Sequence, residues 1–130
     1  MPPTQSTVTK RPRVLVVDDE PLLRRLVSRM VGTLGCESVE AEGIGAARAA
    51  LAAQRFDVVL CDIALGDGSG LDLAAELIAA HGPPIALMSG SVEALEQARA
   101  TLGVLALNKP LDATGLRQAL GALGVALTPR

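Results

Sequence analysis

The chain has 130 residues, the size of one domain, and a chain of this length can bury roughly two thirds of its unfolded surface. The net charge is -2 and no block of Lys and Arg stands out, which argues against direct nucleic-acid binding. No apolar run approaches about 20 residues, so we expect no membrane span. The composition therefore favours a single globular domain with a core of its own.

The hydrophobic share is 49%, yet the single aromatic residue is Phe56, so the core has to be built from aliphatic side chains. Cys36 and Cys61 lie far apart without metal-ligand spacing, and Cys61 falls within an apolar stretch, where it is expected to be a small core residue. Residues 1–12 are polar and lack the apolar core of a secretion signal. We expect a flexible tail at 1–12, one domain at 13–126 and a cytoplasmic location.

Four short apolar stretches and a further short strand-like segment alternate with five segments of helical periodicity, without internal repeats or linkers. The expected strands cover residues 14–17, 37–41, 57–62, 85–88 and 104–107. The expected helices cover residues 21–34, 43–51, 71–80, 92–102 and a last segment that Asp112 caps. Right-handed crossovers then predict an α/β fold with a five-stranded parallel sheet and helices on both faces, the (βα)5 flavodoxin-like doubly wound sandwich.

The helices are expected to be amphipathic. In the first helix the residues expected to face the core are Leu22, Leu23, Leu26, Val27, Met30, Val31 and Leu34. The residues expected on its outer side are Arg24, Arg25, Ser28 and Arg29. In the third helix Leu73, Leu77 and Ile78 are expected to be buried, and the glycine-rich run at 66–70 before it is expected to form a turn.

Polar side chains follow four of the five expected strands. Asp18 and Asp19 follow the first strand and Asp62 ends the third, whereas Ser89 and Lys109 follow the fourth and fifth. Because parallel strands end at one edge of the sheet, these groups are expected to lie together, where ligands of such sheets bind.

Three clustered carboxylates repel one another unless a cation is bound, and Mg²⁺ prefers oxygen ligands together with a phosphate. A lysine and a hydroxyl beside them suit an incoming phosphoryl group, and a carboxylate can be the nucleophile that accepts it. Asp62, at the end of the central strand, is the best candidate for that nucleophile.

Five motifs in this order resemble the receiver domain of bacterial two-component response regulators. They are VLVVDDEP at 14–21, DVVLCD at 57–62, GDGSGLDL at 66–73, Ser89-Gly90 and NKP at 108–110. The resemblance covers nearly the whole chain from about Arg13, and no DNA-binding or enzymatic output domain follows, so we expect a stand-alone receiver.

The resemblance implies that Asp62 accepts a phosphoryl group from a histidine kinase or a phosphotransfer protein. It also implies that Asp19 binds Mg²⁺ directly, Asp18 mainly through water, and Asp62 and the backbone carbonyl of Ala64 complete the protein ligands. Ser89 would then hydrogen-bond the phosphoryl group and Lys109 would pair with it. A cis bond before Pro110 is implied as well. A downstream protein would bind the face made by the fourth helix, the fifth strand and the last helix. We expect no direct binding to nucleic acid or to a membrane.

The sequence departs from the family pattern at two positions. Ala106 stands where receivers usually carry the aromatic residue that moves during switching, and Leu111 stands where Phe is commonest. The usual coupling between the ring and the hydroxyl therefore cannot operate in its normal form. Without an aromatic among them, Leu105, Leu107 and Leu111 are expected in or near the core, and some of them could form a partner face.

Each site residue also has a purely structural interpretation. Asp18 and Asp19 could cap a helix, Ser89 could belong to a turn, and Lys109 could be a solvated lysine. Two rival functions follow. One is a protein-binding module that ignores phosphorylation, suggested by Ala106. The other is an aspartate-dependent phosphatase of the haloacid dehalogenase type, which needs a second acid where Ala64 stands. In the leading interpretation the protein is no ordinary enzyme and catalyses only its own phosphorylation and dephosphorylation.

Overall fold

A computed structural model describes residues 11–127 of the chain. The strands are β1 (Arg13–Val17), β2 (Glu37–Ala41), β3 (Val58–Asp62), β4 (Ala64–Leu65), β5 (Gly68–Ser69), β6 (Ile85–Ser89) and β7 (Leu105–Asn108). The helices are α2 (Pro21–Thr33), α3 (Ile44–Ala53), α4 (Gly70–Ala79), α5 (Val92–Leu102) and α6 (Ala113–Ala122). All five predicted strands and five predicted helices are present, with boundaries within a few residues of those expected.

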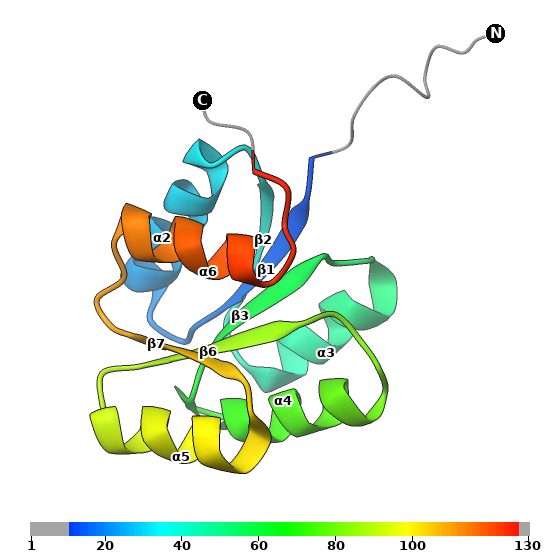
Figure 1. Ribbon diagram of the computed structural model, residues 1–130. Helices are drawn as coiled ribbons and strands as arrows, with labels where there is room; N and C mark the ends of the chain where they lie inside the picture. Colours follow the sequence, from blue (N-terminus) through cyan, green and yellow to red (C-terminus); the bar gives the residue numbers. More distant parts are fainter. Residues whose placement is uncertain (1–10, 128–130) are drawn as a thin grey trace, which may run out of the picture.

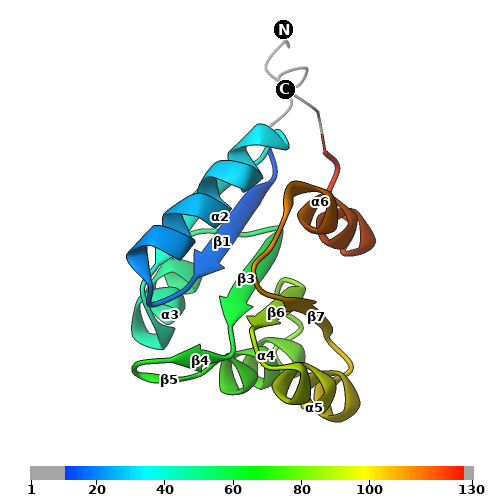
Figure 2. The same cartoon turned by 90° about the vertical axis from the view of Figure 1, so that its left-hand side faces the viewer.

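The main sheet has five parallel strands in the order β2-β1-β3-β6-β7 (Figures 1 and 2). The central strand β3 is buried along its whole length, as the uninterrupted apolar sequence before Asp62 predicts. The short strands β4 and β5 form a separate antiparallel pair after β3. The predicted doubly wound α/β fold is thus confirmed, and the predicted turn at 66–70 proves to include a two-stranded hairpin.

Two aliphatic clusters fill the space on the two faces of the sheet. Alternate residues of the strands point to opposite faces, so Leu15 and Val59 join α3, α4 and α5, whereas Val16 and Leu60 join α2 and α6. Cys61 is fully buried in the first cluster, as predicted from its apolar surroundings. Strands covered on both sides hold their carboxyl ends at a single, well-defined edge.

The prediction of the buried face of α2 was partly wrong. Leu22 and Leu26 are 81% and 50% exposed, whereas Ser28, expected outside, is 7% exposed. The Ser28 hydroxyl has no hydrogen-bond partner among the described residues. The apolar positions of this helix span a wider arc than the sheet can cover, and the helix is turned so that Arg24 reaches the end of β1.

One position of α4 was also predicted wrongly. Ile78 of α4, expected to be buried, is 47% exposed, because the sheet contacts the side of α4 that carries Leu73 and Ala74.

Residues 1–10 of the expected tail lie outside the described residues, but the Arg11 guanidinium donates hydrogen bonds to the carbonyls of Gly35 and Cys36. Within residues 11–127, no helix is both long enough and apolar enough to cross a membrane.

Candidate functional site

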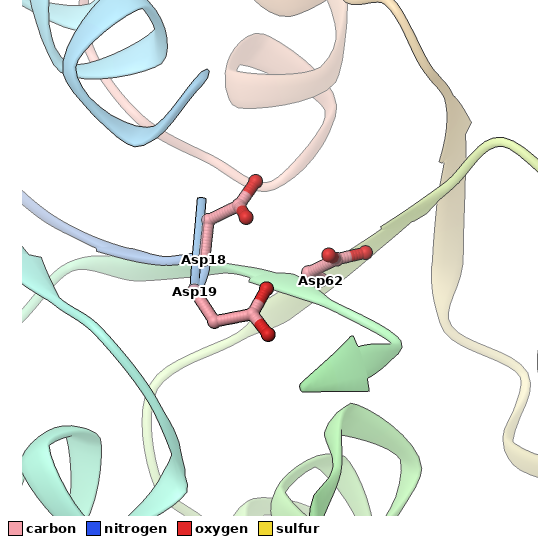
Figure 3. Close-up of side chains that lie close together, drawn as sticks. All are labelled: Asp18, Asp19 and Asp62. Carbon is pink, nitrogen blue, oxygen red and sulfur yellow. The ribbon is translucent and has the colours of Figure 1, made fainter. Parts of the chain in front are cut away.

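Three carboxylates meet at the carboxyl edge of the sheet. Strand β1 pairs with β3 so that Val17 lies opposite Cys61, which sets Asp18 and Asp62 side by side. Asp19 follows on the loop to α2. Oxygens of Asp18, Asp19 and Asp62 all lie within 4.8 Å of one another, and the three side chains point into the same space (Figure 3). The parallel register therefore brings together the acids that the sequence predicted.

Asp18 is fully buried, and its polar atoms are well satisfied. Its Oδ1 accepts a hydrogen bond of 2.9 Å from the Glu20 backbone N–H, which stabilises the turn into α2. Its carbonyl accepts a bond of 2.9 Å from Arg24 Nη1, and Arg24 Nε is ion-paired with Glu40 of β2 at 2.9 Å. Sequence reasoning missed this role of Arg24, since the helical pattern placed the residue on the solvent side.

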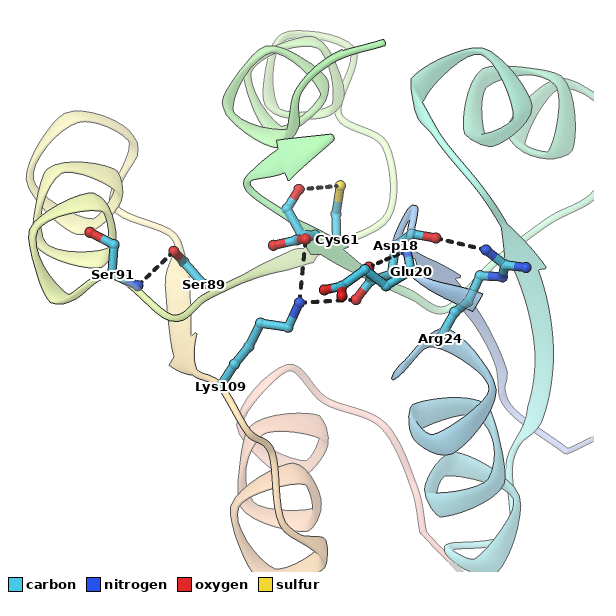
Figure 4. Close-up of polar contacts among 8 residues, drawn as sticks. Asp18, Glu20, Arg24, Cys61, Ser89, Ser91 and Lys109 are labelled. Carbon is cyan, nitrogen blue, oxygen red and sulfur yellow. Dashed lines mark hydrogen bonds and ion pairs between the residues drawn. The ribbon is translucent and has the colours of Figure 1, made fainter. Parts of the chain in front are cut away.

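Lys109 connects two of the acids. Its Nζ lies 3.1 Å from Asp18 Oδ2 and 3.3 Å from Asp62 Oδ2 (Figure 4). Burial by itself lowers the pKa of Lys109, but the hydrogen bond to Asp18 and the charges of Asp62 and Asp18 outweigh it and raise the pKa. The ammonium is therefore firmly charged, and Lys109 is not a solvated strand-end lysine.

Asp62 is under electrostatic stress despite this partner. Burial raises the pKa of its carboxyl, the Lys109 charge opposes that, and the neighbouring Asp18 and Asp19 raise it further. The adjacent Cys61 thiol is affected in the same direction, because burial and then the charge of Asp62 raise its pKa to about 12. One lysine faces three acids, so the site has unbalanced negative charge that a bound cation would relieve.

Ser89 lies at the end of β6, the strand beside β3, and is 9% exposed. Its Oγ accepts a hydrogen bond of 3.0 Å from the Ser91 backbone N–H and is turned toward Ser91 rather than toward the acids (Figure 4). The Lys109 backbone N–H donates to the Ser89 carbonyl at 2.9 Å. The structure thus places Ser89 beside the cluster but with its hydroxyl engaged in the turn that begins α5.

The chain after Asp62 packs closely against the site. Ala64, two residues on, lies exposed in β4. A Cβ atom at Gly70 would lie 2.3 Å from the Asp62 carbonyl oxygen, so only glycine fits there. Asp67, which the sequence predicted only as part of a turn, accepts hydrogen bonds from two backbone N–H groups of α3. No local pattern signals that bond, because its partners are more than 20 residues away.

The positions that depart from the family pattern are accommodated without an aromatic residue. Ala106 is 5% exposed and packs in the cluster shared with α5. Its carbonyl accepts a hydrogen bond of 2.8 Å from Arg99 Nη2 of α5. Leu105, Leu107 and Leu111 are partly buried, as expected, and the peptide bond between Lys109 and Pro110 is cis, as the resemblance implied.

Comparison with known proteins agrees with this geometry. The response regulator receiver domain family model matches residues 14–121. Response regulator protein PilR of Pseudomonas aeruginosa is 36% identical over 111 residues, and the match covers 83% of this chain but 25% of PilR. The photosynthetic apparatus regulatory protein RegA of Rhodovulum sulfidophilum is 34% identical over 122 residues, covering 91% of this chain and 66% of RegA. The chain thus spans a quarter to two thirds of these curated relatives.

Solved structures of receiver domains have the same fold as this chain. A CheY-like receiver domain from Methylobacillus flagellatus superposes with a TM-score of 0.79 at 24% identity, covering 88% of this chain and 99% of that one. The response regulator TrrA of Thermotoga maritima, in complex with Mg²⁺-BeF, has a TM-score of 0.78 at 25% identity, covering 86% and 98%. The chain therefore belongs to the response regulator receiver domain family of two-component signalling.

Proposed function

We propose that this receiver is a phosphoacceptor in which Asp62 takes a phosphoryl group from a histidine kinase or a histidine phosphotransfer protein. The observation that carries the proposal is the placement of Asp62. It ends the central strand, lies within 4.8 Å of two further carboxylates and is paired with a partly buried lysine at 3.3 Å. Helix capping alone does not explain why a lysine 91 positions away in sequence reaches Asp18 as well.

The transfer itself is a simple displacement. A carboxylate oxygen of Asp62 attacks the phosphorus of the phosphohistidine, a P–O bond forms and the P–N bond breaks. The departing imidazole takes up a proton. Charge is spread over the equatorial phosphoryl oxygens in the transition state, and the Lys109 ammonium is positioned to neutralise part of it. The protein acts only on its own aspartate, so we do not regard it as an ordinary enzyme.

The donor set fits Mg²⁺. It consists of hard carboxylate oxygens that lie close together with unbalanced negative charge. In our proposal Asp19 and Asp62 hold the ion directly, Asp18 mainly through water, and the Ala64 backbone carbonyl completes the protein ligands. The ion supplies positive charge for the phosphoryl oxygens. The structure of TrrA in complex with Mg²⁺-BeF supports this assignment by similarity of fold.

Switching is proposed to begin at Ser89. Its oxygen accepts from the Ser91 N–H and is turned away from the acids, so the side chain has to rotate before the hydroxyl can donate a hydrogen bond to the phosphoryl group. We expect this rotation to rearrange residues 89–95. The face made by α5, β7 and α6 would then change its affinity for a downstream protein. Ala106 cannot provide a moving ring, so we expect the shift to be small. The hydrogen bond of Arg99 to the Ala106 carbonyl joins α5 to β7 in the structure described.

We propose a cytoplasmic location, which is consistent with the receiver family to which the chain belongs.

The test is incubation with acetyl phosphate and Mg²⁺, with phosphoryl incorporation measured by intact mass. The native chain should gain one phosphoryl group, and Asp62→Ala should gain none. Asp57→Ala, which removes a carboxylate at the opposite edge of the sheet, should be labelled normally. Unchanged labelling of Asp62→Ala would refute the assignment.

The alternative function, a binding module indifferent to phosphorylation, is favoured by Ala106 alone. It predicts that partner affinity is the same with and without beryllofluoride, whereas our proposal predicts a difference.

A further inference from the structure

The β4–β5 hairpin is the part of the chain that leaves Asp62 and returns to α4. It has two residue pairs, Ala64 with Ser69 and Leu65 with Gly68. Two antiparallel strands of this length are not stable by themselves, so the hairpin needs an external anchor to hold a fixed position. Figure 2 shows it beyond the end of β3, on the side of α3.

Asp67 at the tip of the hairpin supplies that anchor. Its Oδ1 accepts a hydrogen bond of 2.8 Å from the Ile44 N–H, and its Oδ2 accepts one of 3.0 Å from the Gly45 N–H. Helix α3 has Gly43 at its N-cap and no side-chain cap of its own, so the carboxylate of Asp67 serves as a cap from a distant segment. The hydrogen bond from the Gly45 N–H lowers the pKa of Asp67 most, and the bond from the Ile44 N–H lowers it further.

The space around this contact is closely fitted. A Cβ atom at Gly43 would lie 2.6 Å from Asp67 Oδ1, so a side chain there would push the carboxylate away. A Cβ atom at Gly68 would lie 3.2 Å from Ile44 Cγ1, which shows that the hairpin also packs on the first residue of α3. The hairpin is therefore fixed to α3 by hydrogen bonds and by packing.

The neighbouring residue of the hairpin faces the acid cluster. A Cβ atom at Gly66 would lie 3.5 Å from Asp19 Oδ2, so the turn is in contact range of the Asp19 carboxylate. Asp67 thus holds one side of a turn whose other side borders Asp19, and the strand before the turn carries Ala64. A movement of the hairpin would shift Ala64 relative to Asp62 and would change the contact between the turn and Asp19.

We propose that Asp67 is a positioning residue that fixes the β4–β5 hairpin to α3 and so sets the affinity of the acid cluster for Mg²⁺. The proposal rests on the proposed function, since it takes Asp19 and the Ala64 carbonyl as metal ligands. Asp67 itself touches neither the ion nor the phosphoryl group. Removing a residue that orients metal ligands without touching the ion typically weakens metal binding by about 10- to 100-fold.

The experiment titrates Mg²⁺ into ¹⁵N-labelled protein and follows amide shifts, with Asp57→Ala as the matched control. Asp57 Oδ2 also accepts a long-range hydrogen bond from a backbone N–H, that of Arg13 at 2.7 Å, but at the opposite edge of the sheet. We expect roughly tenfold weaker Mg²⁺ binding for Asp67→Ala and unchanged binding for Asp57→Ala. Deuterium exchange at the Ile44 and Gly45 amides should accelerate in Asp67→Ala alone.

Two further measurements separate positioning from charge and from unfolding. Asp67→Asn keeps an oxygen acceptor without the charge, so its Mg²⁺ affinity should lie between those of the native chain and Asp67→Ala. A purely electrostatic effect would vanish at high salt, whereas loss of position persists there. If Asp67→Ala does not fold, Asp67→Asn carries the comparison.

Native Mg²⁺ affinity in both Asp67 variants, or a loss abolished by salt, would overturn the role of Asp67 and leave the proposed function intact. Absence of Mg²⁺ binding in the native chain would refute the proposed function itself and, with it, this role.

Discussion

The carboxylate of Asp62, our proposed phosphoacceptor, lies in a position that disfavours its own charge. It is 7% exposed and lies near two other acids, and Lys109 compensates only in part. The carboxyl therefore has a pKa above its ordinary value of 3.8. This arrangement costs stability in the resting protein and leaves negative charge available for a cation and a phosphoryl donor.

The stress on Asp62 predicts a pH-dependent gain from Asp62→Asn, measured without divalent cations. A carboxyl whose pKa is raised by folding binds more protons in the folded chain, so the free energy of unfolding falls as pH rises from 3.8 through the raised value. Above the raised pKa the penalty is complete, and there Asp62→Asn should raise the free energy of unfolding by about 1 kcal/mol.

Urea denaturation at several pH values measures this gain, which should shrink as pH falls toward 3.8. Asp57→Asn, which weakens the acceptor for the Arg13 N–H, should destabilise instead. An Asp62→Asn variant less stable than the native chain at neutral pH would contradict the interpretation of Asp62 as a strained carboxylate.

Gly70 gives a steric prediction at the same site. In Gly70→Ala the new Cβ would lie 2.3 Å from the Asp62 carbonyl oxygen, so the chain has to shift at a cost of about 1–3 kcal/mol. Gly32→Ala is the matched control, because Gly32 lies in α2 with open space around it and should gain about 0.5–1 kcal/mol. Equal effects of both substitutions in chemical denaturation would be inconsistent with close packing behind Asp62.

At the level of elements, α2 presents an unexpected apolar surface. Leu22 is 81% exposed, and Leu26 lines a groove of about 270 Å³ together with Met30, Lys109 and Pro110. The groove therefore extends to Lys109, which is ion-paired with Asp62. Leu22 lies in the first turn of α2, three residues after Asp19. In the proposed function a donor protein has to bring its histidine to Asp62, so we expect it to contact Leu22.

Leu22→Asp should slow phosphotransfer from a purified cognate histidine kinase by roughly tenfold, since a charge at a packed contact is costly. Labelling by acetyl phosphate, which is too small to need the surface, should stay at the native rate. Ile78→Asp is the control, because Ile78 is 47% exposed on α4, which packs on the opposite face of the sheet from α2. Equal slowing of both phosphate donors would instead indicate damage to the site itself.

The elements also show what the sequence could and could not predict. Short apolar runs indicated the main-sheet strands other than β2, because strands buried on both faces are apolar throughout, and period-3.6 patterns indicated every described helix. The orientation of α2 was not predictable, since its apolar residues cover too wide an arc to select one face. The bonds of Arg24 to the Asp18 carbonyl and of Asp67 to α3 depend on tertiary proximity that no local pattern encodes.

At the level of the whole molecule, the sheet topology places the site. The strand order β2-β1-β3-β6-β7 reverses between β1 and β3, and doubly wound sheets bind ligands at this crevice. Asp18, Asp19 and Asp62 follow or end these two strands, while β6 and β7 bring Ser89 and Lys109 alongside. Parallel strand direction alone predicted the shared edge, and the register between β1 and β3 explains the close approach.

The most direct measurement is the identity of the phosphorylated residue. The chain is incubated with acetyl phosphate and Mg²⁺, the acyl phosphate is reduced with borohydride, and the product is located by peptide mass spectrometry. The account predicts reduction of the side chain at position 62 and nowhere else, and only when Mg²⁺ is present. Modification at another position, or none in a protein that binds Mg²⁺, would contradict it.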